Sequence, residues 1–363
     1  MFEHNYAVIM AGGEGSRLWP LSRQSRPKQM VRLGSERTLF QNAVDRQKAI
    51  IPTDRIFVVT VAAQAEQLQQ QCPEIPRENY LLEPMPRGTA SVVGYAAAAL
   101  RKRDPQAVMA IMTADHLIHN VEYFHRLLAE AYTLAMDGAL VTLGIRPTFP
   151  ATGYGYIQRG ARLENYDFLA YEVKRFKEKP DEEMARRFLA GGDHDWNSGM
   201  FVWRVDRIWA EFQQHMPELA EKLEQITAAW GTPDQDTVLQ AVWPTIQPQT
   251  IDYGIMEKAD RVAVLPAVDL GWNDVGTWES LFEAFETNEE GNLVMDACHV
   301  GVRTQGSLII SDKTDRLIVT LGVEDLVVVD TQDAILVCSR KDAQKVKEVV
   351  GLLKQNEDVK RFL

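Results

Sequence analysis

The sequence has little cysteine and a deficit of basic residues. Its 363 residues include three cysteines, Cys72, Cys298 and Cys338, and no CxxC pair, which excludes a disulfide framework and a cysteine-based zinc site. The formal net charge of -12, from 39 basic and 51 acidic residues, argues against nucleic acid or an anionic membrane as the main partner. Any anionic ligand must therefore be small and bound locally.

Long apolar runs and a signal peptide are also missing. The longest apolar stretches are too short to cross a bilayer. The N-terminus, MFEHNYAVIM, has an acid and a histidine where a signal peptide carries basic residues. We therefore expect a cytoplasmic protein.

Two common nucleotide-binding signatures are absent from the one Gly-rich stretch near the N-terminus, AGGEGSRLWPLSRQSRPK (residues 11–28). A P-loop needs a lysine directly after its last glycine, and none stands there. A dinucleotide fingerprint beginning at Gly13 needs glycine where Leu18 stands, which disfavours a dehydrogenase. Two readings remain: a turn whose backbone N–H groups bind phosphate, or a tight turn with solvated arginines.

The basic residues after these glycines favour phosphate. Arg17, Arg23, Arg26 and Lys28 lie in a segment that also contains two prolines. Because proline restricts the backbone, the segment is stiff. A stiff basic arm can spread several charge-assisted hydrogen bonds over the oxygens of a triphosphate.

Short apolar runs alternate with stretches of helical period through the first part of the chain. The predicted strands are residues 6–10, 55–61, 107–112 and 139–143, and the predicted helices are residues 38–50, 89–103 and 120–136. This alternation predicts an α/β fold with a doubly wound, mostly parallel, Rossmann-like sheet. Ligands of such sheets bind at the carboxyl ends of the strands.

The pattern changes near residue 290, so we expect a catalytic domain at 1–290 and a small β domain at 291–363. Short β-rich pieces from 292 to 339 are separated by Gly and Asp turns without helices, which indicates a β-helix or a β-roll. The closing segment predicts a terminal helix with Val346, Val349, Val350 and Leu353 on one face.

The Gly-rich stretch resembles a known signature. The pattern GGxGxRLxPLS followed by PK is typical of sugar nucleotidyltransferases, and its form with Trp19, RLWPLS, is similar to that of mannose-1-phosphate guanylyltransferases. The resemblance implies that Ala11, Gly12 and Gly13 contact the nucleotide and that Arg17 and Lys28 bind its phosphates.

A second motif, EPMPRGTA (residues 83–90), resembles the EPxxRNTA segment of this family, which lies against guanine. The resemblance implies that Glu83, Arg87, Gly88 and Thr89 bind substrate. Glu83 can accept from the paired N–H groups of the guanine edge. Gly88 replaces the usual asparagine, which leaves one base or ribose contact open, and by itself the stretch also fits a proline-rich turn before a helix.

Two aspartates are candidate metal ligands. Asp115, in TADHLI, follows a predicted strand, where it could also cap the next helix; Asp274 lies in DLGWNDVGTWES. The family places a Mg²⁺-binding aspartate in a similar ADH motif, and the resemblance pairs Asp274 with it. Two carboxylates completed by phosphate oxygens and water suit Mg²⁺. His116 is expected to be a hydrogen-bonded structural residue.

Three motifs resemble the family's sugar-phosphate site. The residues implied are Gly153 in TGYGYI, Glu178 and Lys179 in FKEKPD, and Asn197 in WNSGMF. Carboxylate and amide groups suit hexose hydroxyls, and a lysine suits the phosphate. IDYGIME (residues 251–257) also resembles the family, and we assign it no role beyond support of the site.

The resemblance implies an enzyme that transfers GMP from GTP to mannose 1-phosphate, with Mg²⁺ as cofactor. A guanylyl- or thymidylyltransferase for another sugar phosphate and a non-catalytic subunit that binds GDP-mannose are the alternatives, and retention of the charged residues argues against the latter. Because little chain follows the terminal helix, we expect no isomerase domain and a monofunctional enzyme. A homodimer is the protein partner that the edge strands of the small β unit suggest.

Overall fold

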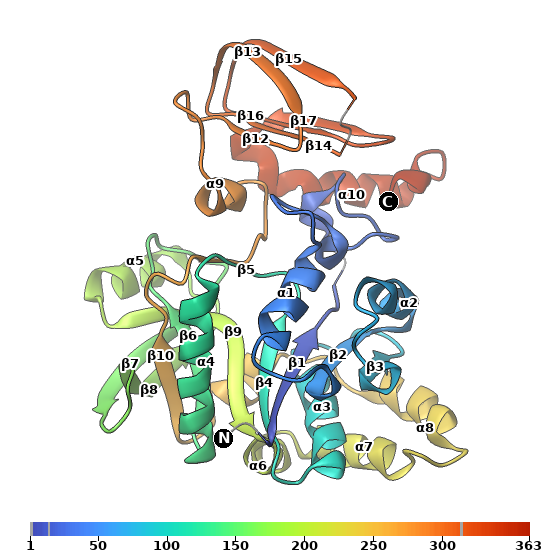
Figure 1. The fold of residues 1–363 in the computed structure, drawn as a ribbon, viewed down its shortest axis with the longest axis vertical. Coiled ribbons are helices and arrows are strands. Elements are labelled where there is room, and N and C mark those ends of the chain that lie inside the picture. Colours follow the sequence, from blue (N-terminus) through green and yellow to red (C-terminus); the bar gives the residue numbers. More distant parts are fainter. Residues whose placement is uncertain (1–2, 14, 313–314) are drawn as a thin grey trace. The chain divides into compact units, whose positions relative to one another are not determined.

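The computed structural model describes residues 3–13, 15–312 and 315–363, so Glu14 of the Gly-rich stretch lies outside the described residues. The chain forms two compact units, each built from separate segments (Figure 1). The sheet unit consists of Met1–Gly12, Val44–Thr113 and Asn120–Leu270. The β-helix unit consists of Gly13–Ala43, Ala114–His119 and Gly271–Leu363.

The sheet unit is built on nine strands in the order β3-β2-β1-β4-β9-β6-β10-β8-β7. In chain order the strands are β1 (Asn5–Met10), β2 (Ile56–Val61), β3 (Tyr80–Glu83), β4 (Val108–Thr113), β6 (Leu140–Ile145), β7 (Tyr156–Leu163), β8 (Ala170–Lys177), β9 (His194–Arg204) and β10 (Val262–Pro266). Strands β3, β2, β1 and β4 are parallel to their neighbours in this group, as are β6 and β10 to each other. The mostly parallel sheet expected from the alternating apolar runs is confirmed.

Strand β9 is antiparallel to both β4 and β6, between which it lies. Its sequence, HDWNSGMFVWR, mixes polar with apolar residues and so lacks the continuous apolar run of the predicted strands. Asp195 and Ser198 of this strand are buried. A central strand that carries polar side chains places hydrogen-bonding groups within the sheet, and the site described below uses Asn197 of this strand.

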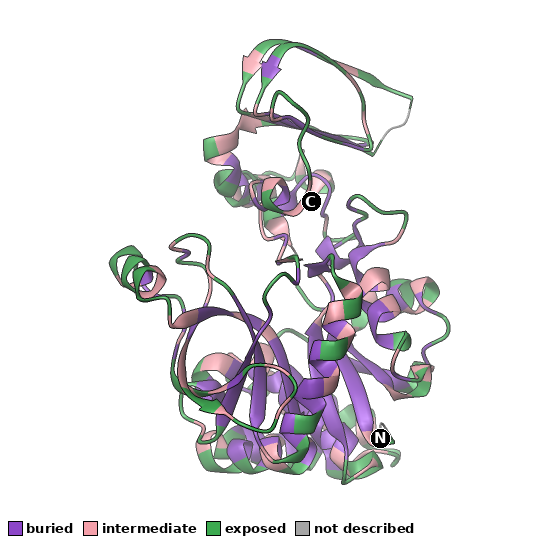
Figure 2. Cartoon of the chain, turned by 60° about the vertical axis from the view of Figure 1, so that its left-hand side comes forward, coloured by how far each residue is buried: buried purple, intermediate pink, exposed green. Residues whose placement is uncertain are grey.

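Helices cover this sheet, whose strands are mostly buried (Figure 2). The helices of the unit are α2 (Ala62–Gln71), α3 (Thr89–Arg103), α4 (Val121–Met136), α5 (Glu182–Gly191), α6 (Val205–His215), α7 (Pro217–Ala228) and α8 (Gln235–Val242), and α1 (Leu39–Lys48) carries the chain from the β-helix unit into it. Gly94 lets α3 pack closely against α6 and α7, since a Cβ there would lie 2.5 Å from Leu223 and 3.3 Å from Phe212. Asn120 caps α4 by accepting a hydrogen bond from the backbone of Tyr123 at 3.1 Å.

The C-terminal strands of the second unit form a β-helix. Its strands are β12 (Leu293–Met295), β13 (Cys298–Gln305), β14 (Leu308–Ser311), β15 (Leu317–Glu324), β16 (Leu326–Asp330) and β17 (Ile335–Ser339). Strands β12, β14 and β16 stack in parallel, and so do β13 and β15. Successive parallel coils of this kind form a β-helix, so of the two folds predicted for this segment the β-helix is the one observed. The terminal helix is α10 (Val346–Gln355), in which Val346 and Val350 are buried and Val349 is 36% exposed.

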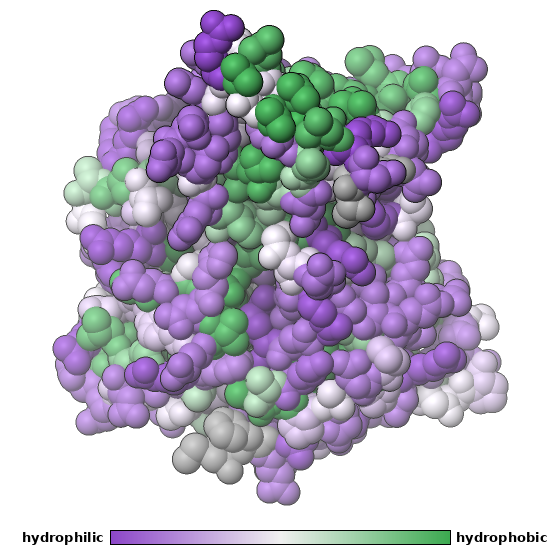
Figure 3. Space-filling model, turned by 45° about the horizontal axis from the view of Figure 1, so that its top comes forward, coloured by the Kyte–Doolittle hydropathy of each residue, from purple (hydrophilic) through white to green (hydrophobic). Residues whose placement is uncertain are grey.

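Shorter elements complete the β-helix unit. They include β5 (Leu117–Ile118), which pairs with β11 (Trp272–Asn273), and α9 (Ser280–Ala284). Apolar side chains also gather on the outer surface of the β-helix, at the top of the view in Figure 3; they are Val300, Val302, Leu317, Val319, Leu321, Ile335 and Val337.

Candidate active site

Lys28 brings two distant aspartates together in the β-helix unit. It begins a 3₁₀ turn after Pro27 and is 8% exposed. Its ammonium donates a hydrogen bond to Oδ2 of Asp115 at 2.7 Å and another to the backbone carbonyl of Asp274. Three segments separated by 87 and 246 residues thus converge on one charged group.

The Asp115 carboxylate is held in its ionised form. Burial acts to raise its pKa, but the Lys28 ammonium, with help from His116, lowers the pKa below its usual value. The ring of His116 accepts a hydrogen bond from the indole of Trp272 at 3.1 Å, in line with the structural role expected for this histidine. Asp115 is therefore a carboxylate anion at neutral pH.

Asp274 lies in a tight turn. Its Oδ1 accepts from the backbone N–H of Gly276 at 3.1 Å, and a Cβ at position 276 would lie 2.9 Å from Oδ2. No group of three or more His, Cys, Asp or Glu side chains that could hold a metal occurs among the described residues. The hard oxygens of Asp115 and Asp274 nevertheless fit Mg²⁺, which is usually held by one or two carboxylates together with substrate phosphates.

The basic residues of the Gly-rich stretch divide into two groups. Arg17 is exposed, and Lys28 faces Asp115. Arg23 and Arg26 point instead toward C-terminal residues, with Arg23 2.6 Å from Asp333 and Arg26 3.6 Å from Asp312. The expected arm of four phosphate-binding cations is thus reduced to Arg17 and Lys28.

Glu83 is a buried carboxylate at the end of β3 in the sheet unit. It is 3% exposed, and burial raises its pKa to about 7. Its Oε2 has no hydrogen-bond partner among the described residues. A Cβ built on Gly12 would lie 3.8 Å from Oε1, and Ala11, at the end of β1, is fixed by backbone bonding to Val59 at 2.9 Å. A buried acceptor beside a glycine backbone is suited to a ligand that brings its own donors.

Three further residues of EPMPRGTA contact the segment of residues 244–251. Arg87 donates to the carbonyl of Pro244 at 2.5 Å, and Thr89 accepts from the backbone of Ile251 at 3.0 Å. Gly88 has φ 84°, and a Cβ there would lie 2.3 Å from the carbonyl oxygen of Gln249. Glycine is therefore required at position 88, which explains why asparagine does not stand there in this chain.

The expected sugar-site residues Glu178, Lys179 and Asn197 meet in the sheet unit. The Lys179 ammonium lies 2.9 Å from Oε1 of Glu178. Asn197 accepts from Thr142 at 3.2 Å and donates to Asp252 at 2.9 Å. This cluster combines carboxylate acceptors, an amide and an ammonium, the groups that recognise hydroxyls and phosphate.

Asp252 is the member that sequence reasoning missed. Burial, and then the nearby charge of Glu178, raise the pKa of Asp252 to about 6. Burial acts to lower the pKa of Lys179, but the hydrogen bond and the charge of Glu178 raise it above its usual value. In the sequence, only the IDYGIME motif pointed to Asp252, because the partners of this residue lie 55 or more residues away in the chain.

The two glycines of TGYGYI differ. A Cβ at Gly155 would lie 2.4 Å from Oε2 of Glu178, whereas one at Gly153 would meet nothing within 4 Å. Gly153, the residue expected at the site, is exposed. Gly155 is the glycine that the packing of Glu178 requires.

Comparison with known proteins identifies two families. Residues 6–291 match the family described as nucleotidyl transferase. Residues 297–353 match the MannoseP isomerase/GMP-like beta-helix domain, in agreement with the parallel coils of β12 to β16.

Curated relatives match nearly the whole chain. A mannose-1-phosphate guanylyltransferase from Klebsiella pneumoniae is 37% identical over 96% of this chain and 74% of its own length. The mannose-1-phosphate guanylyltransferase ManC of Salmonella typhimurium is 38% identical over 96% of this chain and 73% of its own. A solved structure from Thermus thermophilus, named as a mannose-1-phosphate geranyltransferase, is 34% identical with a TM-score of 0.87 and covers 97% of this chain and 99% of its own.

Proposed function

The chain belongs to the nucleotidyl transferase family, and from this we propose that it transfers GMP from GTP to mannose 1-phosphate, giving GDP-mannose and pyrophosphate. The proposal rests on one observation above all: the Lys28 ammonium contacts both Asp115 and the backbone carbonyl of Asp274. The relatives named mannose-1-phosphate guanylyltransferase support the choice of base and sugar.

In the proposed reaction a phosphate oxygen of mannose 1-phosphate attacks the α-phosphorus of GTP. The new P–O bond forms as the bond to the bridging oxygen of the β-phosphate breaks, and pyrophosphate leaves with the electron pair. The nucleophile is already ionised at neutral pH, so no general base is needed. Catalysis of such a step depends on holding two anions in line and on stabilising the charge that develops.

Lys28 and Arg17 would neutralise the phosphates of the nucleotide, and the backbone of Gly12 and Gly13 would approach them. Asp115 and Asp274 would hold Mg²⁺. When bound, that ion supplies positive charge to the phosphate oxygens. The ion pair with Lys28 keeps Asp115 charged in the free protein, so this carboxylate is prepared before the ligand arrives.

Recognition of the base and the sugar would rest on the two clusters of the sheet unit. The unpartnered oxygen of Glu83 would accept from the N–H groups of guanine. Glu178, Asn197 and Asp252 would bind the hexose hydroxyls, and Lys179 the 1-phosphate. A hydroxyl-rich ligand would relieve the crowding of negative charge between Glu178 and Asp252.

Pyrophosphate release across a panel of nucleoside triphosphates and sugar 1-phosphates, with and without Mg²⁺, tests the proposal. We expect release with GTP, mannose 1-phosphate and Mg²⁺, and at least about tenfold less with dTTP or glucose 1-phosphate, because a site built to hydrogen-bond one ligand rejects an analogue that leaves its polar groups unpaired. Preference for dTTP would support a thymidylyltransferase. Binding of GDP-mannose without any turnover would support the regulatory subunit.

A homodimer and a cytoplasmic location stay predictions. None of the described helices has the length and apolar character that a bilayer span requires. Sedimentation velocity of the purified chain would measure its oligomeric state.

A further inference from the structure

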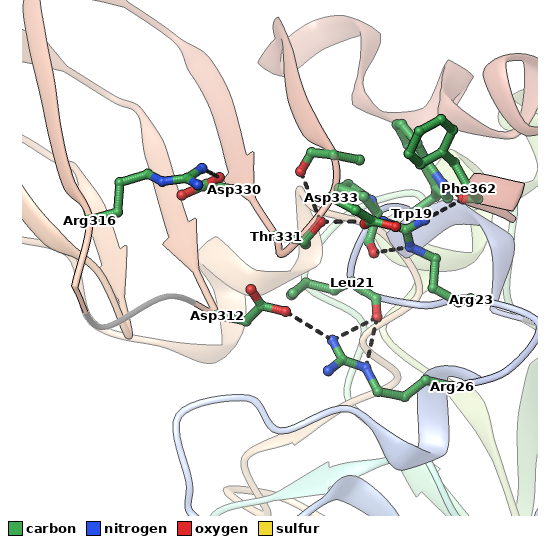
Figure 4. A network of polar contacts seen from close by, with 12 residues as sticks. Trp19, Leu21, Arg23, Arg26, Asp312, Arg316, Asp330, Thr331, Asp333 and Phe362 are labelled. Atoms are coloured by element: carbon green, nitrogen blue, oxygen red, sulfur yellow. Dashed lines mark hydrogen bonds and ion pairs between the residues drawn. The ribbon is translucent and has the colours of Figure 1, made fainter. Parts of the chain in front are cut away.

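Arg23 is an arginine of the Gly-rich stretch that does not face Lys28. Only 11% of its side chain is exposed. Its guanidinium donates to Asp333 Oδ1 at 2.6 Å and to Thr331 Oγ1 at 3.3 Å, in the turn after β16 (Figure 4). It also donates to the carbonyl of Pro20 at 2.7 Å and to that of Phe362.

Trp19 shares one of these acceptors. Its indole N–H donates to the Phe362 carbonyl at 2.7 Å, and the guanidinium carbon of Arg23 lies 5.6 Å from the centre of its ring. Trp19 is 8% exposed and belongs to the hydrophobic core of the β-helix unit, which also contains Val346 and Val350 of α10. Two side chains of the stretch are thus joined to the C-terminal residues of the same unit.

Hydrogen bonds within residues 15–26 cross-link the segment that carries Arg23. Ser22 donates to the carbonyl of Gly15 at 2.6 Å, and the backbones of Arg23 and Arg26 exchange hydrogen bonds of 2.9 and 3.1 Å. Gly15 lies directly against Lys28, since a Cβ there would be 2.4 Å from the lysine's own Cβ. Arg23 and Lys28 therefore belong to one short, cross-linked loop.

A purely solvated arginine would not have these contacts. Exposed ion pairs contribute little, because water screens them and two side chains lose freedom. A mostly buried guanidinium must have its donors satisfied, and here four acceptors from three separate segments do so. The contacts of Arg23 hold the backbone of its loop in one conformation, and a lysine that binds phosphate needs such a fixed position.

We propose that Arg23 is a positioning residue for Lys28: it ties the loop of residues 15–28 to the 331–333 turn and to the Phe362 carbonyl, and these contacts set the affinity of the loop for a triphosphate. The inference rests on the proposed function, in which Lys28 binds the nucleotide phosphates. The C-terminal residues then act on nucleotide binding without touching the nucleotide.

Arg23→Met, Arg23→Lys and Arg26→Met give a matched series within one loop. Arg26 is the control, because 44% of its side chain is exposed and its contacts are the Leu21 carbonyl and a 3.6 Å pair with Asp312. We expect Arg23→Met to raise the KM for GTP by about tenfold or more, the scale of a lost charge-assisted hydrogen bond. The KM of this variant for mannose 1-phosphate should stay within about twofold of the wild-type value. Arg23→Lys should recover part of the lost affinity for GTP, because a lysine keeps the positive charge opposite Asp333 but lacks the several N–H donors of the guanidinium.

Wild-type KM for GTP in a folded Arg23→Met protein would overturn the proposal. So would an Arg26→Met protein with an equal defect, or a fall in kcat with both KM values unchanged. If Arg23→Met does not fold, Asp333→Asn removes the charge of a single partner whose side chain is 49% exposed. This variant should likewise have a raised KM for GTP, and a wild-type KM would overturn the proposal.

A second readout separates this inference from the proposed function. Inorganic tripolyphosphate is titrated into the full chain by calorimetry, and amide exchange is measured over residues 15–28. We expect Arg23→Met to weaken tripolyphosphate binding and to speed exchange in this loop, even if the wild-type chain transfers no guanylyl group. Unchanged affinity and unchanged exchange would contradict the positioning role whatever the activity.

Discussion

The ammonium of Lys28 and a carboxylate oxygen of Asp115 are 2.7 Å apart, although 87 residues separate them in the chain. The ammonium keeps the carboxylate charged, since Lys28 holds the pKa of Asp115 below its usual value. In the proposed reaction the pair supplies one cation for phosphate and one anion for the metal.

Lys28→Ala should lower turnover by about 10²-fold or more, the scale for a lost preorganised electrostatic contact. Pyrophosphate release under saturating substrates measures this. Lys48→Ala is a matched control, because Lys48 is a partly exposed lysine paired with Asp45 and Glu74. Near-normal turnover of a folded Lys28→Ala protein would remove the lysine from the mechanism.

Asp274→Asn should cause a similar loss, about 10²-fold, because an amide is a weaker ligand for a hard cation than a carboxylate. A Mg²⁺ titration distinguishes the cause. If Asp274 holds the metal, the half-saturating Mg²⁺ concentration rises in the variant. A loss of turnover with an unchanged Mg²⁺ requirement would refute the metal role.

Recognition of guanine should depend on the ionisation of Glu83, whose pKa burial raises to about 7. Only the carboxylate accepts two hydrogen bonds from the N–H groups of guanine. The KM for GTP should therefore fall as the pH rises through about 7. Glu83→Gln should raise the KM by about tenfold or more and flatten the pH profile; a variant that keeps the wild-type pH profile would assign it to another group.

Asp252 should make the protein less stable as the pH rises. Folding raises its pKa from 3.8 to about 6, so the native state binds the proton more tightly than the unfolded state does. Stability is greatest below about pH 4 as far as this group is concerned, and about 3 kcal/mol is lost as the pH rises from about 4 to about 6. Urea unfolding of Asp252→Asn should lack this loss, and an unaltered pH dependence would contradict it.

The two glycines of the sugar-site loop provide a matched pair of alanine substitutions. Gly155→Ala places a methyl group 2.4 Å from Glu178 Oε2, whereas Gly153→Ala meets nothing within 4 Å. We expect Gly155→Ala to raise the KM for mannose 1-phosphate by about tenfold, as displaced hydrogen-bonding groups lose their geometry. Gly153→Ala should behave as wild type, and equal effects at both positions would show that the loop senses any side chain.

Much of the fold could be predicted because its signals are local. The apolar runs of β1, β2, β4 and β6 and the helical period of α3 and α4 lie within single segments. The resemblance to mannose-1-phosphate guanylyltransferases, carried by motifs of a few residues, is confirmed by relatives at 37% identity. The antiparallel β9 could not be predicted in this way, because its inward polar residues break the apolar pattern on which strand prediction depends.

The site was harder to predict because its partners are distant. The motifs named Lys28, Asp115 and Asp274, but nothing in them showed that Arg23 turns toward Asp333 rather than toward phosphate. IDYGIME indicates no more than support of the site, since the importance of Asp252 comes from its contact with Asn197 of β9, 55 residues away in the chain. The roles of the named residues stay predictions, as does a domain boundary at residue 290.

The bond between Trp19 and the Phe362 carbonyl joins residues 343 positions apart. During synthesis residues 15–28 leave the ribosome before most of the sheet unit, whereas the residues that anchor them, in the 331–362 region, emerge after it. Because domains form in the order in which their parts emerge, the sheet unit can begin to fold while the loop still lacks these contacts. The loop of residues 15–28 thus gains its contacts with residues 331–362 only after every segment of the sheet unit has been synthesised.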